Sequence, residues 1–146
     1  ALDTYLQHMK DLKRDGTYYD LILTGDLSRY GKTIMKDLLK EENQKYNEYD
    51  DCGCLLYDVT QNVYQGGSGP VCNGLVSFGY IYQMMLKGKY QRVLVLATGA
   101  LLNPVMTNQK LSILVFVMAM YWRLSNELRL ILFVLWVCVR CCSTNL

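Results

Sequence analysis

A glycine-rich loop followed at once by a helix is the clearest anion-binding feature of this chain. Gly66, Gly67 and Gly69 surround Ser68, and apolar residues then recur at helical spacing from position 71 to position 85. Free backbone N–H groups at the start of such a helix can hold an anion. The loop lacks the Gly-Lys-Ser/Thr of a Walker loop and does not match the dinucleotide fingerprint, so only this general property is expected.

Cys72 lies in the first turn of the same predicted helix, where the helix dipole would favour its thiolate. A free cysteine also behaves as a small hydrophobic residue. We therefore expect Cys72 to be a small buried side chain in preference to a nucleophile.

The six cysteines and the single histidine do not form a metal centre at the spacings present. Cys52 and Cys54 are closer together than the usual zinc pair, and no second pair or histidine follows at ligand spacing. We expect reduced structural thiols, no metal and no cofactor. His8 lies off the apolar stripe of its predicted helix and is expected to be a solvated surface residue. Asp50 and Asp51 are expected to form a solvated turn.

Two further turns follow predicted strands at residues 19–24 and 93–97. Gly25 and Asp26 follow the first strand, and Thr98 and Gly99 turn the chain after the second. Open α/β sheets place ligand sites at the carboxyl ends of their strands, so these turns and the glycine loop can converge on one pocket. Asp26 or Ser28 can also cap the next helix, and we favour that role because it is the commoner one.

The elements that must position these loops follow from apolar periodicity. Residues 42–51 are polar and are expected to be a surface connection. In the helix after the glycine loop, Val71, Leu75, Phe78, Ile81 and Met85 fall in one apolar stripe. The expected elements are a helix at 1–14, a strand at 19–24, a helix at 30–41, a hairpin at 55–59 and 62–64, a helix at 71–85 and a strand at 93–97. They predict one α/β domain with a mixed sheet packed with helices.

The overall composition limits the classes of partner. A chain of 146 residues is about the size of one domain. Its net charge of +2 is small and scattered, which argues against nucleic acid. Residues 1–16 are charged and amphipathic and do not form a signal sequence. The chain begins without methionine, which leads us to expect a fragment.

Four strings of residues resemble the stage V sporulation protein AD family. They are residues 19–27, 51–53, 66–69 and 92–104, and the resemblance covers residue 1 to about residue 113. It corresponds to the C-terminal part of a protein more than twice as long. The resemblance implies the C-terminal half of a thiolase-like fold.

The resemblance also implies a function. Members of this family bind dipicolinic acid, are not known as enzymes, and help to move this compound with calcium into the developing spore. They work with other stage V sporulation A proteins at the forespore or spore inner membrane, which implies peripheral membrane association.

The resemblance also allows the loop residues to be compared with the catalytic residues of related enzymes. Condensing enzymes of this fold take a cysteine nucleophile from the N-terminal half, a histidine after one strand of the C-terminal half, and a histidine or asparagine in the next glycine-rich loop. Here these last two positions fall near Gly25 and at residues 67–70, where neither residue type is present. Acyl transfer then has no proton carrier. We therefore expect a non-catalytic binding protein with no catalytic residues, whose ligand-binding loops contain Gly25, Asp26, Ser68, Gly69, Thr98 and Gly99.

Residues 114–146 depart from the family. After Ile113 the family continues Pro-Cys-Ile-Ala-His-Ala-Val, and restoring one base within a proline codon allows residues 114–123 to be read as Pro-Cys-Ile-Cys-His-Gly-Asn-Val-Leu-Glu. We hypothesise a one-base deletion after Ile113, so that residues 1–113 are the half-domain and residues 114–146 are a frameshifted, poorly defined hydrophobic tail. The apolar spans 111–122 and 128–139 are too short to cross a bilayer, which needs about twenty residues. A strand or helix that packs on the domain, or an aggregation-prone segment, is the expectation.

Two other functions stay open. The chain could be a degenerate acyltransferase fragment related to thiolases or ketoacyl synthases. It could also be a membrane-interacting accessory protein, an alternative that rests on the apolar tail alone.

Overall fold

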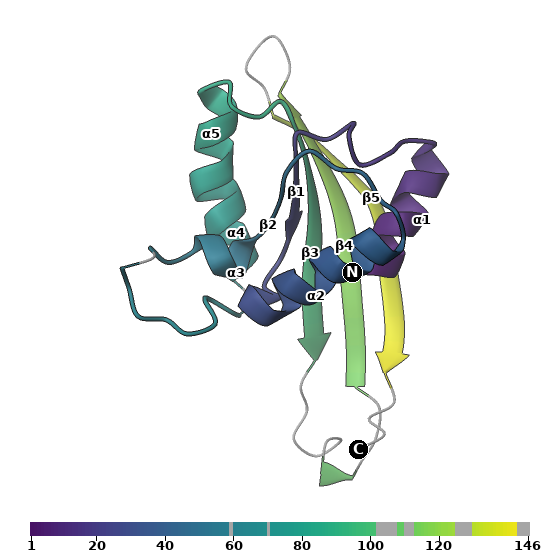
Figure 1. Ribbon diagram of the computed structural model, residues 1–146, viewed down its shortest axis with the longest axis vertical. Coiled ribbons are helices and arrows are strands. Elements are labelled where there is room, and N and C mark those ends of the chain that lie inside the picture. The colour runs from purple at the N-terminus through teal and green to yellow at the C-terminus, as the bar shows by residue number, and fades with distance from the viewer. Residues whose placement is uncertain (59, 70, 102–107, 110–112, 125–129, 143–146) are drawn as a thin grey trace.

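The computed structural model describes residues 1–58, 60–69, 71–101, 108–109, 113–124 and 130–142. Its middle layer is a five-stranded mixed sheet in the order β2-β1-β3-β4-β5 (Figure 1). β1 is parallel to β2 and to β3, whereas β4 is antiparallel to β3 and to β5. The strands are β1 (Leu21–Thr24), β2 (Tyr49–Asp51), β3 (Arg92–Leu101), β4 (Ile113–Leu124) and β5 (Leu130–Cys142).

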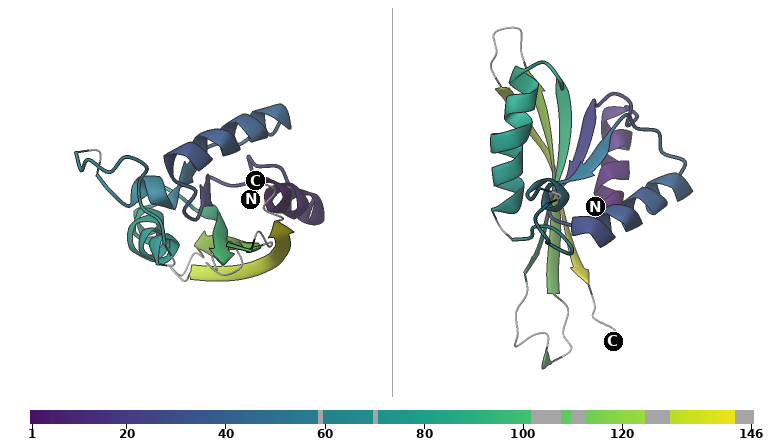
Figure 2. Two further views of the ribbon diagram at one scale, coloured as in Figure 1. Left: turned by 90° about the horizontal axis from the view of Figure 1, so that it is seen from below. Right: turned by 60° about the vertical axis from the view of Figure 1, so that its left-hand side comes forward.

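Helices cover both faces of the sheet (Figure 2). One face carries α1 (Leu2–Leu12) and α2 (Ser28–Glu41). The other carries a continuous helix made of α4 (Cys72–Gly74), the π-helical segment η1 (Leu75–Ile81) and α5 (Tyr82–Leu86), with the short α3 (Cys52–Leu55) at its start. The predicted α/β class, with a mixed sheet packed with helices, is confirmed.

β3 shows why a continuous apolar run becomes a central strand. Val93 and Val95 face the core under the 72–86 helix, and Leu94 and Leu96 face the core under α1 and α2. All four are fully buried. Successive side chains of a strand point to opposite faces, so only a strand covered on both sides is apolar at every position.

β3 is longer than the predicted strand. The turn expected at Thr98 and Gly99 is wrong, because both residues lie within β3 and pair with Val117 and Phe116 of β4. The antiparallel partner supplies hydrogen bonds beyond the point where β1 ends, and this carries the strand on to Leu101.

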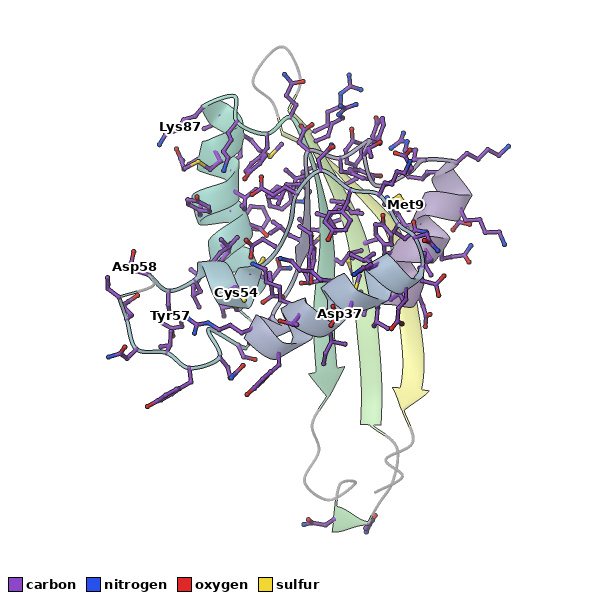
Figure 3. The ribbon with its side chains drawn as sticks, in the orientation of Figure 1. Met9, Asp37, Cys54, Tyr57, Asp58 and Lys87 are labelled. Atoms are coloured by element: carbon purple, nitrogen blue, oxygen red, sulfur yellow. The ribbon has the colours of Figure 1, made fainter. Side chains whose placement is uncertain are left out.

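The segment between α2 and the glycine loop differs most from expectation. The surface connection predicted at 42–51 contains β2. The hairpin predicted at 55–59 and 62–64 is wrong, since Leu55 ends α3 and the described residues from 56 to 64 lie in no strand. The Asp58 side chain accepts hydrogen bonds from the Thr60 N–H and hydroxyl at 2.9 and 2.7 Å, which bends the chain locally. Tyr57 and Asp58 lie on this projecting loop (Figure 3).

The 72–86 helix is wider than an α-helix in its middle, where η1 is π-helical. Its buried residues are Cys72, Val76, Ser77, Ile81 and Met85. Cys72 and Ser77 are five residues apart, as are Val76 and Ile81, and a π-helical turn brings residues at this spacing onto one face.

The predicted apolar stripe of this helix is therefore split between two faces. Ile81 and Met85 are buried as expected, but Val71, Leu75 and Phe78 are 63%, 57% and 60% exposed. The predicted stripe assumes the α-helical period, and the π-helical segment rotates its first half away from the sheet.

Residues beyond 113 contribute two of the five strands, β4 and β5. The boundary at residue 113 and the hypothesis of a frameshift stay predictions, and residues 125–129 and 143–146 of the tail lie outside the described residues. Among the described residues, no helix has the length and apolar character that crossing a bilayer requires.

His8 is buried, contrary to the expectation of a solvated residue. It is 2% exposed on α1, and its Nε2 lies 2.6 Å from the Tyr19 hydroxyl. Burial, with a smaller contribution from Arg14, lowers the pKa of His8 below its ordinary value. The neutral imidazole is thus part of the core.

His8 is the only histidine, so it should set the pH dependence of stability near neutrality. Its pKa is lower in the folded state, which binds fewer protons than the unfolded state. The free energy of unfolding should therefore fall as the pH drops below about 6.5, by no more than about 1.4 kcal/mol per pH unit. Urea denaturation between pH 5.5 and 7.5 measures this slope.

The His8→Gln variant is the control, because glutamine does not titrate in this range. Its slope between pH 5.5 and 7.5 should be close to zero. An equal slope in both proteins would contradict the assignment to His8.

Candidate functional site

The parallel strands bring three chain segments to one edge of the sheet. Thr24 at the end of β1 pairs with Asp51 at the end of β2 and with Leu96 of β3. The residues that follow β1 therefore lie beside Thr98, as expected for the carboxyl ends of parallel strands.

Asp26 connects the end of β1 with β3 and with the glycine loop. Its Oδ2 accepts hydrogen bonds from the Ser68 hydroxyl and the Gly69 N–H, both at 3.1 Å. Its Oδ1 accepts from the Thr98 hydroxyl at 2.9 Å, and that hydroxyl oxygen in turn accepts from the Asp26 N–H at 3.2 Å. We call Asp26, Ser68, Gly69 and Thr98 the Asp26 cluster. The Asp26 side chain is half-buried, so the cluster lies at the surface of the domain.

The structure brings together five of the six predicted site residues. Gly25 adjoins the Asp26 cluster, and a Cβ on it would lie 2.7 Å from the Thr98 backbone nitrogen, so only glycine allows this close approach. Gly99 is one residue further along β3, opposite Phe116 of β4. That these residues bind a ligand stays a prediction.

Asp51 is the residue that the sequence did not reveal. It is fully buried, so the expected solvated turn is wrong for this residue. Its Oδ2 accepts from the Thr24 hydroxyl at 2.7 Å and the Leu27 N–H at 2.9 Å. Its Oδ1 accepts from the Ser28 N–H at 2.8 Å and the Gly53 N–H at 2.9 Å. A signal was present in the sequence, since an aspartate directly before a short helix is a preferred N-cap.

Asp51 also replaces the predicted caps of α2. Neither Asp26 nor Ser28 caps this helix, because the first free N–H groups bond to Asp51 from β2. The Ser28 hydroxyl instead donates to the Gly67 carbonyl at 3.1 Å. A carboxylate placed at a helix N-terminus is also favoured by the helix dipole.

The glycine loop is held against the start of α3. The Gly67 N–H donates to the Gly53 carbonyl at 2.7 Å. Gly66 has a φ of +98°, and a Cβ on it would lie 2.3 Å from the same carbonyl oxygen. This contact fixes the direction in which Ser68 and Gly69 leave the loop toward Asp26, so glycine is needed here on both conformational and steric grounds.

Burial controls the protonation of the groups nearby. It raises the pKa of Asp51, against the opposing effect of its four hydrogen bonds. It also raises the pKa of the Cys52 thiol to about 12 and the pKa of the Cys72 thiol above its ordinary value. Cys72 is 3% exposed, which fits the expected small buried side chain, and neither thiol is primed as a nucleophile.

The groups of the Asp26 cluster can bind a polar ligand through hydrogen bonds, and no histidine is among them. They are backbone N–H groups, two hydroxyls and one carboxylate, and His8 is on α1 bonded to Tyr19. Among the residues that the structure describes, no group of three His, Cys, Asp or Glu side chains could hold a metal ion.

A small pocket lies next to the glycine loop. It has a volume of about 360 Å³ and is lined by Arg29 and residues 61–64. The Arg29 N–H donates to the Gln65 carbonyl at 3.0 Å, which places this pocket directly before the glycines. Of its lining residues, Arg29 alone is charged.

Two comparisons with known proteins identify the same family. The family model described as stage V sporulation protein AD (SpoVAD) matches residues 1–121. A curated relative, stage V sporulation protein AD of Bacillus subtilis (strain 168), is 50% identical over 111 residues, which are 75% of this chain and 33% of the relative. The chain thus spans about a third of the length of that relative.

The Asp51→Asn variant should be less stable by about 2–4 kcal/mol. Each carboxylate oxygen accepts two of the four hydrogen bonds, and an amide has one acceptor oxygen. Two of the four buried donors therefore lose their partner, and the other two lose a charged one. Urea denaturation at pH 7 measures the difference.

The matched control is Asp50→Asn. Asp50 is the neighbouring residue, is partly exposed and pairs with Lys32 at the surface. Its loss should cost less than about 1 kcal/mol. Equal losses in the free energy of unfolding would contradict the role of the buried Asp51 hydrogen bonds in stability.

Proposed function

Because this chain belongs to the stage V sporulation protein AD family, we propose that it is part of a non-catalytic protein that binds dipicolinic acid during its uptake into the developing spore. The ligand is dipicolinate alone or as its calcium chelate. The observation that carries the proposal is the Asp26 cluster, where three donors already hold a carboxylate.

The geometry of the Asp26 cluster suits a dicarboxylate ligand in one of two ways. A ligand carboxylate can take the place of Asp26 on the Ser68 hydroxyl, the Gly69 N–H and the Thr98 hydroxyl. Alternatively, Asp26 can stay in place and contact the calcium ion of a chelate, because carboxylate oxygens are preferred calcium ligands. The charge of Asp26 repels a free dianion, so the chelate is the better match.

The pocket beside the glycine loop has a cationic residue among those that line it. Arg29 lines it, and a guanidinium can bind a carboxylate through two hydrogen bonds. Its volume of about 360 Å³ lies within the range of small-molecule sites.

Two buried thiols bear on the proposed lack of catalysis. Acyl transfer needs a base or an activated nucleophile, and burial raises the pKa of both Cys52 and Cys72. The proposed partners, other stage V sporulation A proteins, and a peripheral location at the spore inner membrane rest on the family resemblance.

Calorimetric titration of this chain, and of the longer family protein carrying it, with dipicolinate and with its calcium chelate tests the proposal. We expect saturable binding. The Asp26→Asn variant should bind the chelate about tenfold more weakly, equivalent to about 1.4 kcal/mol, because a carboxylate contact to calcium is lost.

The Asp50→Asn variant serves as the control, since Asp50 bonds to Lys32 away from the Asp26 cluster, and its affinity should be unchanged. No binding by the longer protein, combined with turnover of an acyl-CoA, would favour the acyltransferase alternative. Unchanged chelate binding by Asp26→Asn would place the ligand elsewhere.

A further inference from the structure

Ser28 has a backbone conformation that is unusual for its place in the fold. Of the described residues other than glycine, three have a positive φ: Lys13, Ser28 and Asn43. Lys13 and Asn43 follow the last turns of α1 and α2, where left-handed residues commonly end helices. Ser28, with a φ of +62°, is instead the first residue of α2. This conformation is strained for a residue with a side chain, and it persists only where the surroundings fix it.

Two contacts hold Ser28 in this conformation. Its N–H donates to Asp51 Oδ1 at 2.8 Å, and its hydroxyl donates to the Gly67 carbonyl at 3.1 Å. The Gly67 N–H donates in turn to the Gly53 carbonyl at 2.7 Å, and the Gly53 N–H donates to the same Asp51 oxygen at 2.9 Å. We call Ser28, Asp51, Gly53 and Gly67 the Ser28 ring, because their hydrogen bonds form a closed circuit. It joins the end of β2, the start of α2, the glycine loop and the start of α3 (Figure 1).

The Ser28 ring is closely packed around Gly53. A Cβ on Gly53 would collide with the Gly67 carbonyl oxygen, and it would lie 2.9 Å from Asp51 Oδ1 and 3.2 Å from Ser28 Oγ. Polar atoms of three chain segments therefore converge on one point of the backbone. All of them belong to this chain, and both Asp51 and Gly53 are buried. The arrangement thus does not depend on what covers the surface of the domain.

The Ser28 hydroxyl also sets the direction of the Ser68 N–H. The Gly67 carbonyl and the Ser68 N–H belong to one planar trans peptide unit, so they point in opposite directions. With the carbonyl turned toward Ser28, the N–H points away from Ser28, and no described residue accepts a hydrogen bond from it. Ser68 is exposed, and its hydroxyl and the Gly69 N–H already bond to Asp26. Successive donors of this kind can form an anion-binding concavity.

We propose that Ser28 is a positioning residue for the Asp26 cluster, and that the Ser68 N–H is a further donor to the ligand carboxylate. Ser28 does not touch the ligand. It holds the Gly67 carbonyl, and this contact turns the next N–H toward the ligand. The inference rests on the binding role proposed above. A glycine at position 28 would relieve the strain, but it has no hydroxyl to offer the Gly67 carbonyl.

Three substitutions of Ser28 separate positioning from stability. Ser28→Ala removes the hydroxyl alone, and Ser28→Gly removes the hydroxyl and relieves the strain. Ser28→Thr keeps the hydroxyl and adds strain, because a β-branched residue tolerates a positive φ poorly. In urea, Ser28→Gly should therefore unfold at a higher midpoint than Ser28→Ala, and Ser28→Thr at a lower midpoint than the unaltered protein. Circular dichroism checks the fold of each variant.

The affinity for the calcium chelate of dipicolinate should follow the hydroxyl and not the stability. We expect Ser28→Ala and Ser28→Gly to bind about three- to tenfold more weakly, as for the loss of one hydrogen bond, and Ser28→Thr to stay within about twofold of the unaltered protein. Calorimetric titration of this chain, and of the longer family protein carrying it, measures these values.

Amide hydrogen exchange measures the positioning without any ligand. The Gly67 and Gly69 N–H groups bond to Gly53 and Asp26, and both should exchange severalfold faster in Ser28→Ala and Ser28→Gly but not in Ser28→Thr. The matched control is Thr33→Ala, which removes another hydroxyl-to-carbonyl bond of α2, from Thr33 to Arg29 at 3.0 Å. It should leave both exchange rates and the chelate affinity unchanged.

The two readouts distinguish this inference from the proposed function. If the unaltered protein binds no chelate, the proposed function fails, and the exchange rates alone decide whether Ser28 positions the loop. Unchanged Gly69 exchange in Ser28→Gly would overturn the inference, as would a chelate affinity that falls in Ser28→Thr but not in Ser28→Gly. The Ser68 amide proton resonance should shift downfield as the chelate binds, and binding without this shift would remove the Ser68 N–H from the site.

Discussion

The arrangement of the loops depends on one buried carboxylate. Asp51 accepts four hydrogen bonds, from the end of β1, from two N–H groups at the start of α2 and from the start of α3. An ionised group without partners would be very costly to bury, so its position is fixed by the donors around it. The Tyr49 hydroxyl extends the network by donating to Thr24 at 2.9 Å, since the Thr24 hydrogen is used on Asp51. Through these contacts Asp51 sets the path of residues 25–28.

A second carboxylate has a different position and role. Asp26 comes directly after β1, and the path that Asp51 imposes directs its side chain to the glycine loop and to β3. It is half-buried, whereas Asp51 is fully enclosed. The enclosed carboxylate acts on the fold, whereas the half-buried one is accessible from solvent, as the proposed binding role requires. This division supports a binding role for the exposed end of the strands, with rigid elements behind it.

Apolar periodicity and glycine content predicted the elements of this fold that depend on neighbouring residues in the sequence. The apolar run of β3, the stripe of α1 and the glycine loop all gave the correct element, and parallel pairing then brought Gly25, Asp26 and Thr98 together. β2 was missed because its sequence Tyr-Asp-Asp lacks an apolar run, and its burial comes from partners distant in the chain. His8 and Asp51 were expected to be solvated for the same reason, since their burial depends on partners elsewhere in the chain. The π-helical segment was not predicted, because the apolar residues from Val71 to Met85 also match the α-helical period.

The pairing of β1 with β3 has a consequence during synthesis. Residues 21–24 must wait for residues 93–96, which a ribosome adds several seconds later at roughly 5–20 residues per second. Until then β1 is paired on one edge by β2, and the edge that later pairs with β3 is open. The nascent chain therefore passes through a stage at which one sheet edge can pair with other chains, and chaperone demand should be greatest at that stage.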